Sequence, residues 1–92
     1  MKEFWEACGL KDSIDEWGLY PDLTLDNLFR YAVPKVDRIG VINFRRHYNN
    51  REWYCYLNLH KSPWEVEEYG DDPAQALYQA LRKVLIGEKD VR

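Results

Sequence analysis

The chain has 92 residues, of which 46% are hydrophobic, 15% aromatic and 32% charged, and its formal net charge is −3. This length predicts a single domain, and this balance of apolar and charged residues excludes a disordered tail. The sequence start predicts no secretory signal peptide, and no apolar run is long enough to cross a bilayer, so we expect a cytoplasmic protein that does not enter the membrane.

The first 23 residues are predicted to form a short helix and an irregular segment that packs on the domain. Within residues 2–10, Phe4, Trp5 and Cys8 share one side at helical spacing, and Gly9 suits the end of a helix. The irregular segment is too apolar to remain in water, because it contains Ile14, Trp17, Leu19, Tyr20 and Leu23.

A second helix is predicted to begin after Thr24, a favourable N-cap residue. Pro34 should end or kink this helix near Val33, since proline has no backbone N–H to donate. Its expected apolar face consists of Leu25, Leu28, Phe29 and Ala32.

Two strands are predicted next, at residues 38–48 and 51–60, joined by a tight turn at Asn49-Asn50. A two-residue turn places Phe44 opposite Cys55 and Ile42 opposite Leu57, so the apolar faces of both strands coincide. A third strand is predicted at residues 64–69, with Trp64 and Val66 on the same core face.

The last helix has the clearest start in the chain. Asp72 is its expected N-cap, Pro73 takes the first helical position, and Gln75 completes a capping box. Gly87 suits its end, and residues 88–92 are expected to form a frayed tail. Its apolar stripe consists of Ala74, Leu77, Tyr78, Leu81, Val84 and Leu85.

These elements predict an α+β domain over residues 1–92, with a three-stranded antiparallel meander sheet and the order α-α-β-β-β-α. Residues 1–23 form the N-terminal helix and packing segment, and residues 24–87 form the α-β-β-β-α core.

The polar face of the predicted sheet is the candidate functional surface. Tyrosine and arginine are common in binding surfaces, because they combine contact area with a polar group. The alternative is that residues 1–23 fold over this face and close it. The candidate binding residues are Asn43, Arg45, His47, Tyr54 and Tyr56.

Catalytic chemistry has little support in the sequence, and we expect no enzyme, no cofactor and no metal site. Nucleophile elbows, phosphate-binding loops and metalloprotease helices are absent. The cysteines, Cys8 and Cys55, are too far apart in the sequence for a zinc motif and are expected to be reduced thiols. An acid/base site would need His47 and His60 together with Glu52, Glu65 or Glu67.

Nucleic-acid binding is the alternative function. The order α-β-β-β-α is similar to that of double-stranded RNA-binding domains, which grip phosphates with lysines where the last helix begins. Here Asp71 and Asp72 occupy that place and would repel phosphates. The basic residues that favour nucleic acid are Lys35, Arg38, Arg45, Arg46 and Arg51.

Two stretches, residues 25–35 (LDNLFRYAVPK) and 70–77 (GDDPAQAL), resemble small bacterial and phage proteins of the phage ABA sandwich type. The resemblance implies a phage or prophage origin, a bacterial host cell, and helices on both faces of the sheet. It carries over no functional residues, because such proteins have no assigned activity.

The leading hypothesis is therefore a non-enzymatic protein-interaction module of phage or prophage type. Its partner would be a host or phage protein, and the chain itself would be a monomer or weak homodimer.

Overall fold

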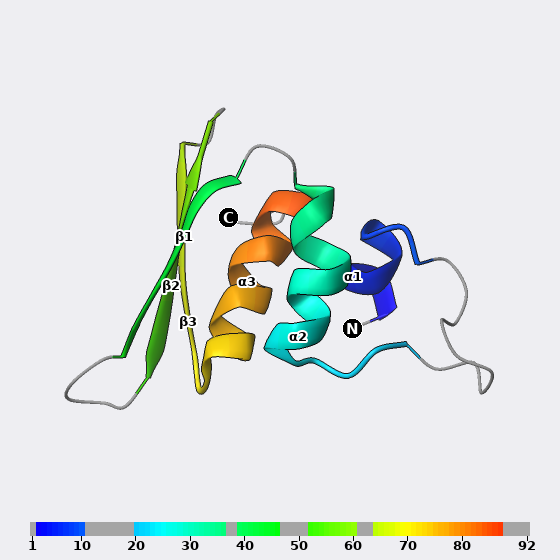
Figure 1. Cartoon of the computed structure of the whole chain (residues 1–92), viewed down its shortest axis with the longest axis horizontal. Coiled ribbons are helices and arrows are strands. Elements are labelled where there is room, and N and C mark those ends of the chain that lie inside the picture. The colour runs from blue at the N-terminus through cyan, green and yellow to red at the C-terminus, as the bar shows by residue number, and fades with distance from the viewer. Residues whose placement is uncertain (1, 11–19, 37–38, 47–51, 61–63, 88–92) are drawn as a thin grey trace.

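The computed structural model describes residues 2–10, 20–36, 39–46, 52–60 and 64–87. In this part of the chain, helical segments precede three strands and a last helix follows them, as predicted (Figure 1). The strands form one antiparallel sheet in the order β1-β2-β3, so each strand pairs with the next in the sequence. The predicted α+β class and meander sheet are confirmed.

The strands are β1 (Ile39–Arg46), β2 (Trp53–Leu59) and β3 (Glu65–Gly70). Phe44 lies opposite Cys55 and Ile42 opposite Leu57, so the register predicted from coinciding apolar faces is confirmed. The predicted turn at Asn49-Asn50 lies outside the described residues.

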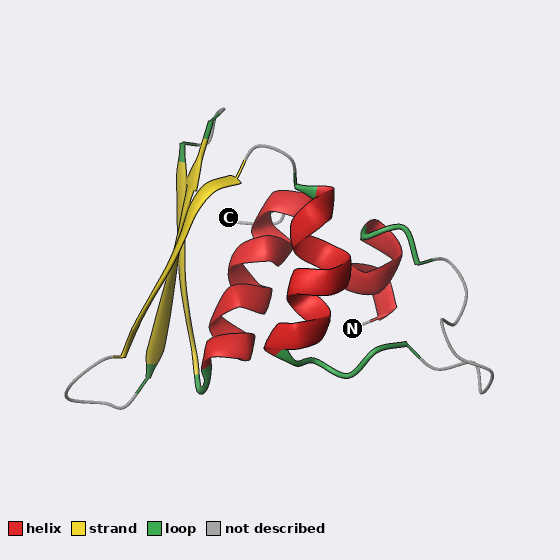
Figure 2. Ribbon diagram, in the orientation of Figure 1, coloured by secondary structure: helices red, strands yellow, loops and turns green. Residues whose placement is uncertain are grey.

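The inner face of the sheet forms the core together with α3 (Pro73–Leu85). Ala76 and Ala80 are fully buried, and their small side chains allow the helix axis to approach the strands closely. Figure 2 shows α3 lying along one face of the sheet. The buried residues of the strands are Cys55, Leu57, Leu59 and Val66.

The N-cap residue of α3 and the glycine after its end are those predicted from the sequence. Asp72 is the N-cap, and its Oδ1 accepts a hydrogen bond from the backbone N–H of Gln75 at 2.8 Å. Pro73 follows at the first helical position. At the other end Gly87 has a φ of +98°, a backbone conformation that glycine adopts without steric cost.

The described helices all lie on one face of the sheet, which corrects the expectation of helices on both faces (Figure 1). α3 contacts β2 and β3 on one side, and η1 (Leu28–Ala32) and α1 (Lys2–Ala7) away from the sheet. α1 lies there because its aromatic residues pack on helical segments. The Phe4 ring lies 4.8 Å from that of Tyr78 in α3, and the Trp5 ring lies 6.5 Å from that of Tyr31.

The second helix departs from a regular α-helix, and the prediction that Phe29 lies on its buried face is wrong. After a short α-helical turn, α2 (Leu25–Asn27), the chain forms the π-helical turn η1 and then a 3₁₀ turn, η2 (Val33–Lys35). The change to a 3₁₀ turn at Val33 agrees with the prediction that Pro34 ends or kinks the helix there. Phe29 is 44% exposed, because the wider π turn shifts the angular spacing of residues while Leu28 stays buried.

The prediction that Trp64 lies in the core is also wrong, because its side chain is 61% exposed. β3 begins one residue later, at Glu65, so strand alternation does not fix the direction of the Trp64 side chain. Its backbone carbonyl accepts a hydrogen bond from the Leu59 N–H at 2.7 Å.

Candidate functional site

The outer face of the sheet carries three rows of side chains across the strands. One row is Val41, Asn58 and Glu65, the next is Asn43, Tyr56 and Glu67, and the third is Arg45, Tyr54 and Tyr69. The described helices lie on the opposite side (Figure 1). The N-terminal segment was a candidate cover for this face, but its described parts, residues 2–10 and 20–23, lie on the helical side.

Four of these side chains surround a shallow depression of about 240 Å³, lined by Asn43, Arg45, Tyr54 and Tyr56. All four are candidate binding residues from the sequence, and the strand register brings them together as two adjacent cross-strand pairs. His47, the fifth candidate, lies outside the described residues. We refer to this feature below as the outer-face depression.

Tyr54 forms the wall of the depression toward β3. Its ring centroid lies 5.3 Å from that of Tyr69, at an interplanar angle of 48°. Partial burial and a hydrogen bond to the Glu67 carboxylate raise the pKa of Tyr54, while the nearby Arg45 lowers it. The Tyr54 hydroxyl is therefore protonated at neutral pH and donates to Glu67.

Tyr56 is held by a contact within its own strand. Its hydroxyl accepts a hydrogen bond from Asn58 Nδ2 at 3.3 Å. A tyrosine hydroxyl that accepts one bond can still donate its own hydrogen. Tyr56 therefore keeps a hydrogen-bond donor, and it lines the depression opposite Asn43 on the neighbouring strand.

Charge on the outer face is divided between its two edges. Arg45 on β1 is exposed, and no carboxylate among the described residues forms an ion pair with it. The acids Glu65 and Glu67 are exposed on β3, with β2 and its tyrosines between them and Arg45. Arg45 is thus a cation without a described counterion beside two aromatic rings.

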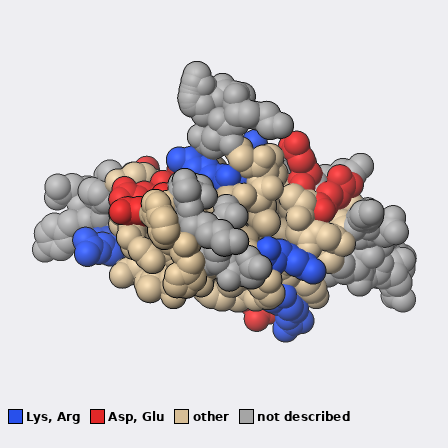
Figure 3. Space-filling view, turned by 90° about the horizontal axis from the view of Figure 1, so that it is seen from above, with Lys and Arg blue, Asp and Glu red and all other residues tan. Residues whose placement is uncertain are grey.

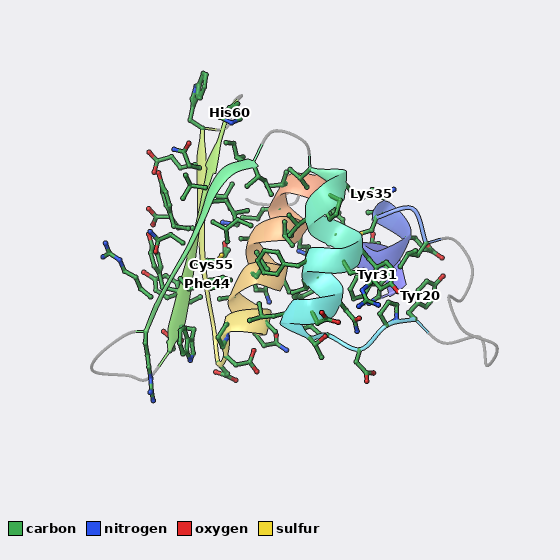
Figure 4. The ribbon with its side chains drawn as sticks, viewed as in Figure 1. Tyr20, Tyr31, Lys35, Phe44, Cys55 and His60 are labelled. Carbon is green, nitrogen blue, oxygen red and sulfur yellow. The ribbon has the colours of Figure 1, made fainter. Side chains whose placement is uncertain are left out.

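The basic residues that favoured nucleic acid do not form one patch in the described structure. Lys35 lies on the helical side (Figure 4), where its Nζ is close to Gly9. Arg45 belongs to β1 of the sheet. Arg45 and Arg46 are consecutive in β1 and point to opposite faces. On the side of the molecule that Figure 3 shows, acidic and basic side chains are intermixed. The other two basic residues, Arg38 and Arg51, lie outside the described residues.

The histidine acid/base site is not assembled by the residues that can be described. His60 follows β2 at the end of the sheet, and its ring lies over Gly40 in β1 (Figure 4). Gly40 is the extra residue of a β-bulge, since the register shifts between Ile39 and Val41. The histidine thus fills the space where this glycine has no side chain.

Both thiols are buried and protonated. Burial raises the pKa of Cys55 to about 12. Burial also raises the pKa of Cys8 to about 11, although the positive charge of Lys35 opposes this effect. Thiols with such values are poor nucleophiles at neutral pH.

Among the described residues, no group of three or more His, Cys, Asp or Glu side chains could hold a metal ion. The helices in the described ranges are all too short or too polar to cross a membrane.

Comparison with known proteins gives no relative for this chain. No protein-family model, no curated protein and no solved structure matches it. The site must therefore be interpreted from its own geometry.

Tyr69 is the site residue that sequence reasoning did not select. It is 46% exposed and packs against Tyr54, which forms the wall of the depression. Extending the predicted register from the second strand to the third would have placed these two tyrosines opposite each other.

Proposed function

We propose that this chain is a non-enzymatic protein-interaction module that binds a partner protein through the outer face of its sheet. The observation that carries the proposal is a sheet face that no described helix covers, with tyrosines beside an arginine (Figure 1). Tyrosine and arginine are over-represented among the residues that dominate protein-binding energies.

The rigid strand that carries these side chains supports the same function. Tyr54 and Tyr56 alternate along β2 with Cys55 and Leu57, which are fully buried. A strand anchored by its core side chains holds the intervening tyrosines in place before any partner arrives. Binding then costs less conformational entropy than it would on a loop.

A protein partner suits this face better than nucleic acid does. A nucleic acid crossing all three strands would meet Glu65 and Glu67. Of the described basic candidates, Arg45 shares this face, whereas Lys35 lies on the helical side and Arg46 points to the opposite face of the sheet. The resemblance to phage proteins leads us to propose that the partner comes from a phage or its bacterial host.

A photo-crosslinking experiment tests the proposed function. Benzoylphenylalanine is placed at Val41, which is 49% exposed on the outer face, or at Phe29, which is 44% exposed on the helical side. In cells that produce the protein, we expect a protein adduct from position 41 and none from position 29. The adduct should disappear when Tyr54→Ser and Tyr56→Ser are combined with the crosslinker at position 41.

The proposal fails if position 29 alone gives the adduct, or if the adduct at position 41 survives loss of both tyrosines. The circular dichroism spectrum and melting temperature of the double variant provide the folding control. Both should stay near those of the unaltered protein, because Tyr54 and Tyr56 lie outside the buried core.

A further inference from the structure

We infer that the outer-face depression receives the carboxylate of an aspartate or glutamate side chain from the partner protein. This inference rests on the proposed function and adds the chemistry of the group that is bound. It follows from the hydrogen-bonding capacity and the charge of the four residues that line the depression.

The residues that line the outer-face depression offer hydrogen-bond donors to a ligand. The Arg45 guanidinium has five N–H groups in a planar fork that matches a carboxylate, and no described carboxylate pairs with it. The Tyr56 hydroxyl already accepts a hydrogen bond from Asn58, and it can still donate its own hydrogen to a ligand. The Asn43 amide adds two N–H donors across from Tyr56.

The acids of the same face are kept away from this group of donors. Glu67 accepts the hydrogen bond of Tyr54, which places that tyrosine between the carboxylate and Arg45. Glu65 and Glu67 belong to β3, whose backbone lies about 10 Å from that of β1 across the sheet. A single carboxylate beside β1 can contact Arg45 without crossing to β3, and physiological salt weakens the repulsion between exposed charges on the two strands.

The same distribution of charge disfavours a polyanion. A nucleic acid presents a phosphate at every nucleotide, so a strand laid across the face would bring further phosphates to Glu65 and Glu67. A protein segment can present one acidic side chain among neutral ones. The tyrosine rings would then contact the neutral residues that flank the acid.

Two blocked pentapeptides test the inference by nuclear magnetic resonance titration of the isotope-labelled protein. One carries a single central glutamate and the other a central glutamine, so the two differ only in the charge of one side chain. We expect saturable shifts of the amide signals of Asn43, Arg45, Tyr54 and Tyr56 with the glutamate peptide. Binding of the glutamine peptide should be weaker by about tenfold or more.

Arg45→Gln should reduce the affinity for the glutamate peptide to that for the glutamine peptide. Arg46→Gln is the matched control, because it removes the same charge from the next residue, which points to the opposite face of the strand. We expect this control to change the affinity by less than about twofold. The amide spectra of both variants, recorded without peptide, verify that the fold is retained.

Several results would overturn the inference. Equal responses to the two peptides, no response at millimolar concentration, or equal losses from Arg45→Gln and Arg46→Gln each contradict it. A thymidine oligonucleotide that shifts the same signals more strongly than the glutamate peptide, with steep salt dependence, would instead assign the face to nucleic acid.

The crosslinking experiment separates this inference from the proposed function. If the partner is captured and its binding needs Tyr54 and Tyr56 but not Arg45, the interaction module stands and the carboxylate inference is wrong. If the glutamate peptide binds as expected but position 41 captures no protein, the depression is an anion site and the interaction module is wrong.

Discussion

At Gly70 the chain passes from β3 toward α3 with no room for a side chain. A Cβ atom there would lie 2.5 Å from the backbone nitrogen of Ala76 and 2.6 Å from Gln75 Cβ. These atoms belong to the first turns of α3 and cannot move without shifting the helix. We expect Gly70→Ala to lower the free energy of unfolding by about 1–3 kcal/mol, measured by urea denaturation.

Gly40→Ala is the control for this substitution. Its Cβ would lie 2.9 Å from Cε1 of His60, the far end of an exposed side chain that can rotate away. The loss of stability should therefore be clearly smaller than for Gly70→Ala. An equal or larger loss would show that backbone contact is not what makes Gly70 necessary.

The two buried thiols should make the free energy of unfolding fall as the pH rises through the alkaline range. Burial raises the pKa of Cys8 from 9.0 to about 11 and that of Cys55 from 9.0 to about 12. Between pH 9 and 11 the unfolded chain has lost these protons while the folded chain keeps them, so the free energy of unfolding should fall as the pH rises. Urea denaturation at several pH values measures this slope.

A double variant, Cys8→Ala with Cys55→Ala, should show a flatter dependence over the same range. An unchanged slope would assign the alkaline loss of stability to other groups. The folded wild-type protein should also react slowly with thiol reagents at neutral pH, and reaction should become fast in denaturant.

At the scale of elements, α3 depends on the cap at its start. Asp72 accepts the backbone hydrogen bond of Gln75 at 2.8 Å, which satisfies a donor that the helix itself cannot. Asp72→Ala should cost about 1 kcal/mol of stability by urea denaturation, and Asp72→Ser should restore most of it. Asp71→Ala removes the same charge one residue earlier and should have little effect.

The strands could be predicted closely because one physical rule governs them. Side chains alternate between faces, so Ile42, Phe44, Cys55 and Leu57 could meet in only one register. The helix that begins after Thr24 could not be predicted as well. The hydrophobic spacing of an α-helix does not indicate a π-helical turn, and this turn leads Phe29 into solvent.

The sequence could predict which residues share the candidate site, but it could not predict whether that face of the sheet is exposed. Alternation alone places Asn43, Arg45, Tyr54 and Tyr56 on one face. Whether that face stays open depends on where Phe4 and Trp5 pack, and the sequence favours neither side of the sheet. Their contacts with Tyr78 and Tyr31 exist only in three dimensions.

For the whole molecule, α1 is part of the single core and not an accessory. Phe4 is only 1% exposed and packs edge-on against Tyr78 of α3. The helix α3 in turn contacts β2 and β3 of the sheet. Phe4→Ala should cost about 3–5 kcal/mol, a large part of the stability of a domain this small. A thermal melt followed by circular dichroism measures the loss.

Phe29→Ala provides the comparison, since this phenylalanine is also helical but is 44% exposed. We expect it to shift the melting temperature much less than Phe4→Ala does. Similar shifts would mean that α1 adds no more to the core than a partly exposed surface residue.

Placement of every described helix on one face of the sheet has a consequence for how this protein can change over time (Figure 2). Substitutions at Asn43, Arg45, Tyr54 and Tyr56 leave the buried residues of β2 and α3 untouched. Under the proposed function, recognition and folding would be encoded in alternate positions of the same strands, and mutation could alter recognition with little cost to folding. A lineage of such chains could acquire new binding partners by drift on the outer face while its inner face stays fixed.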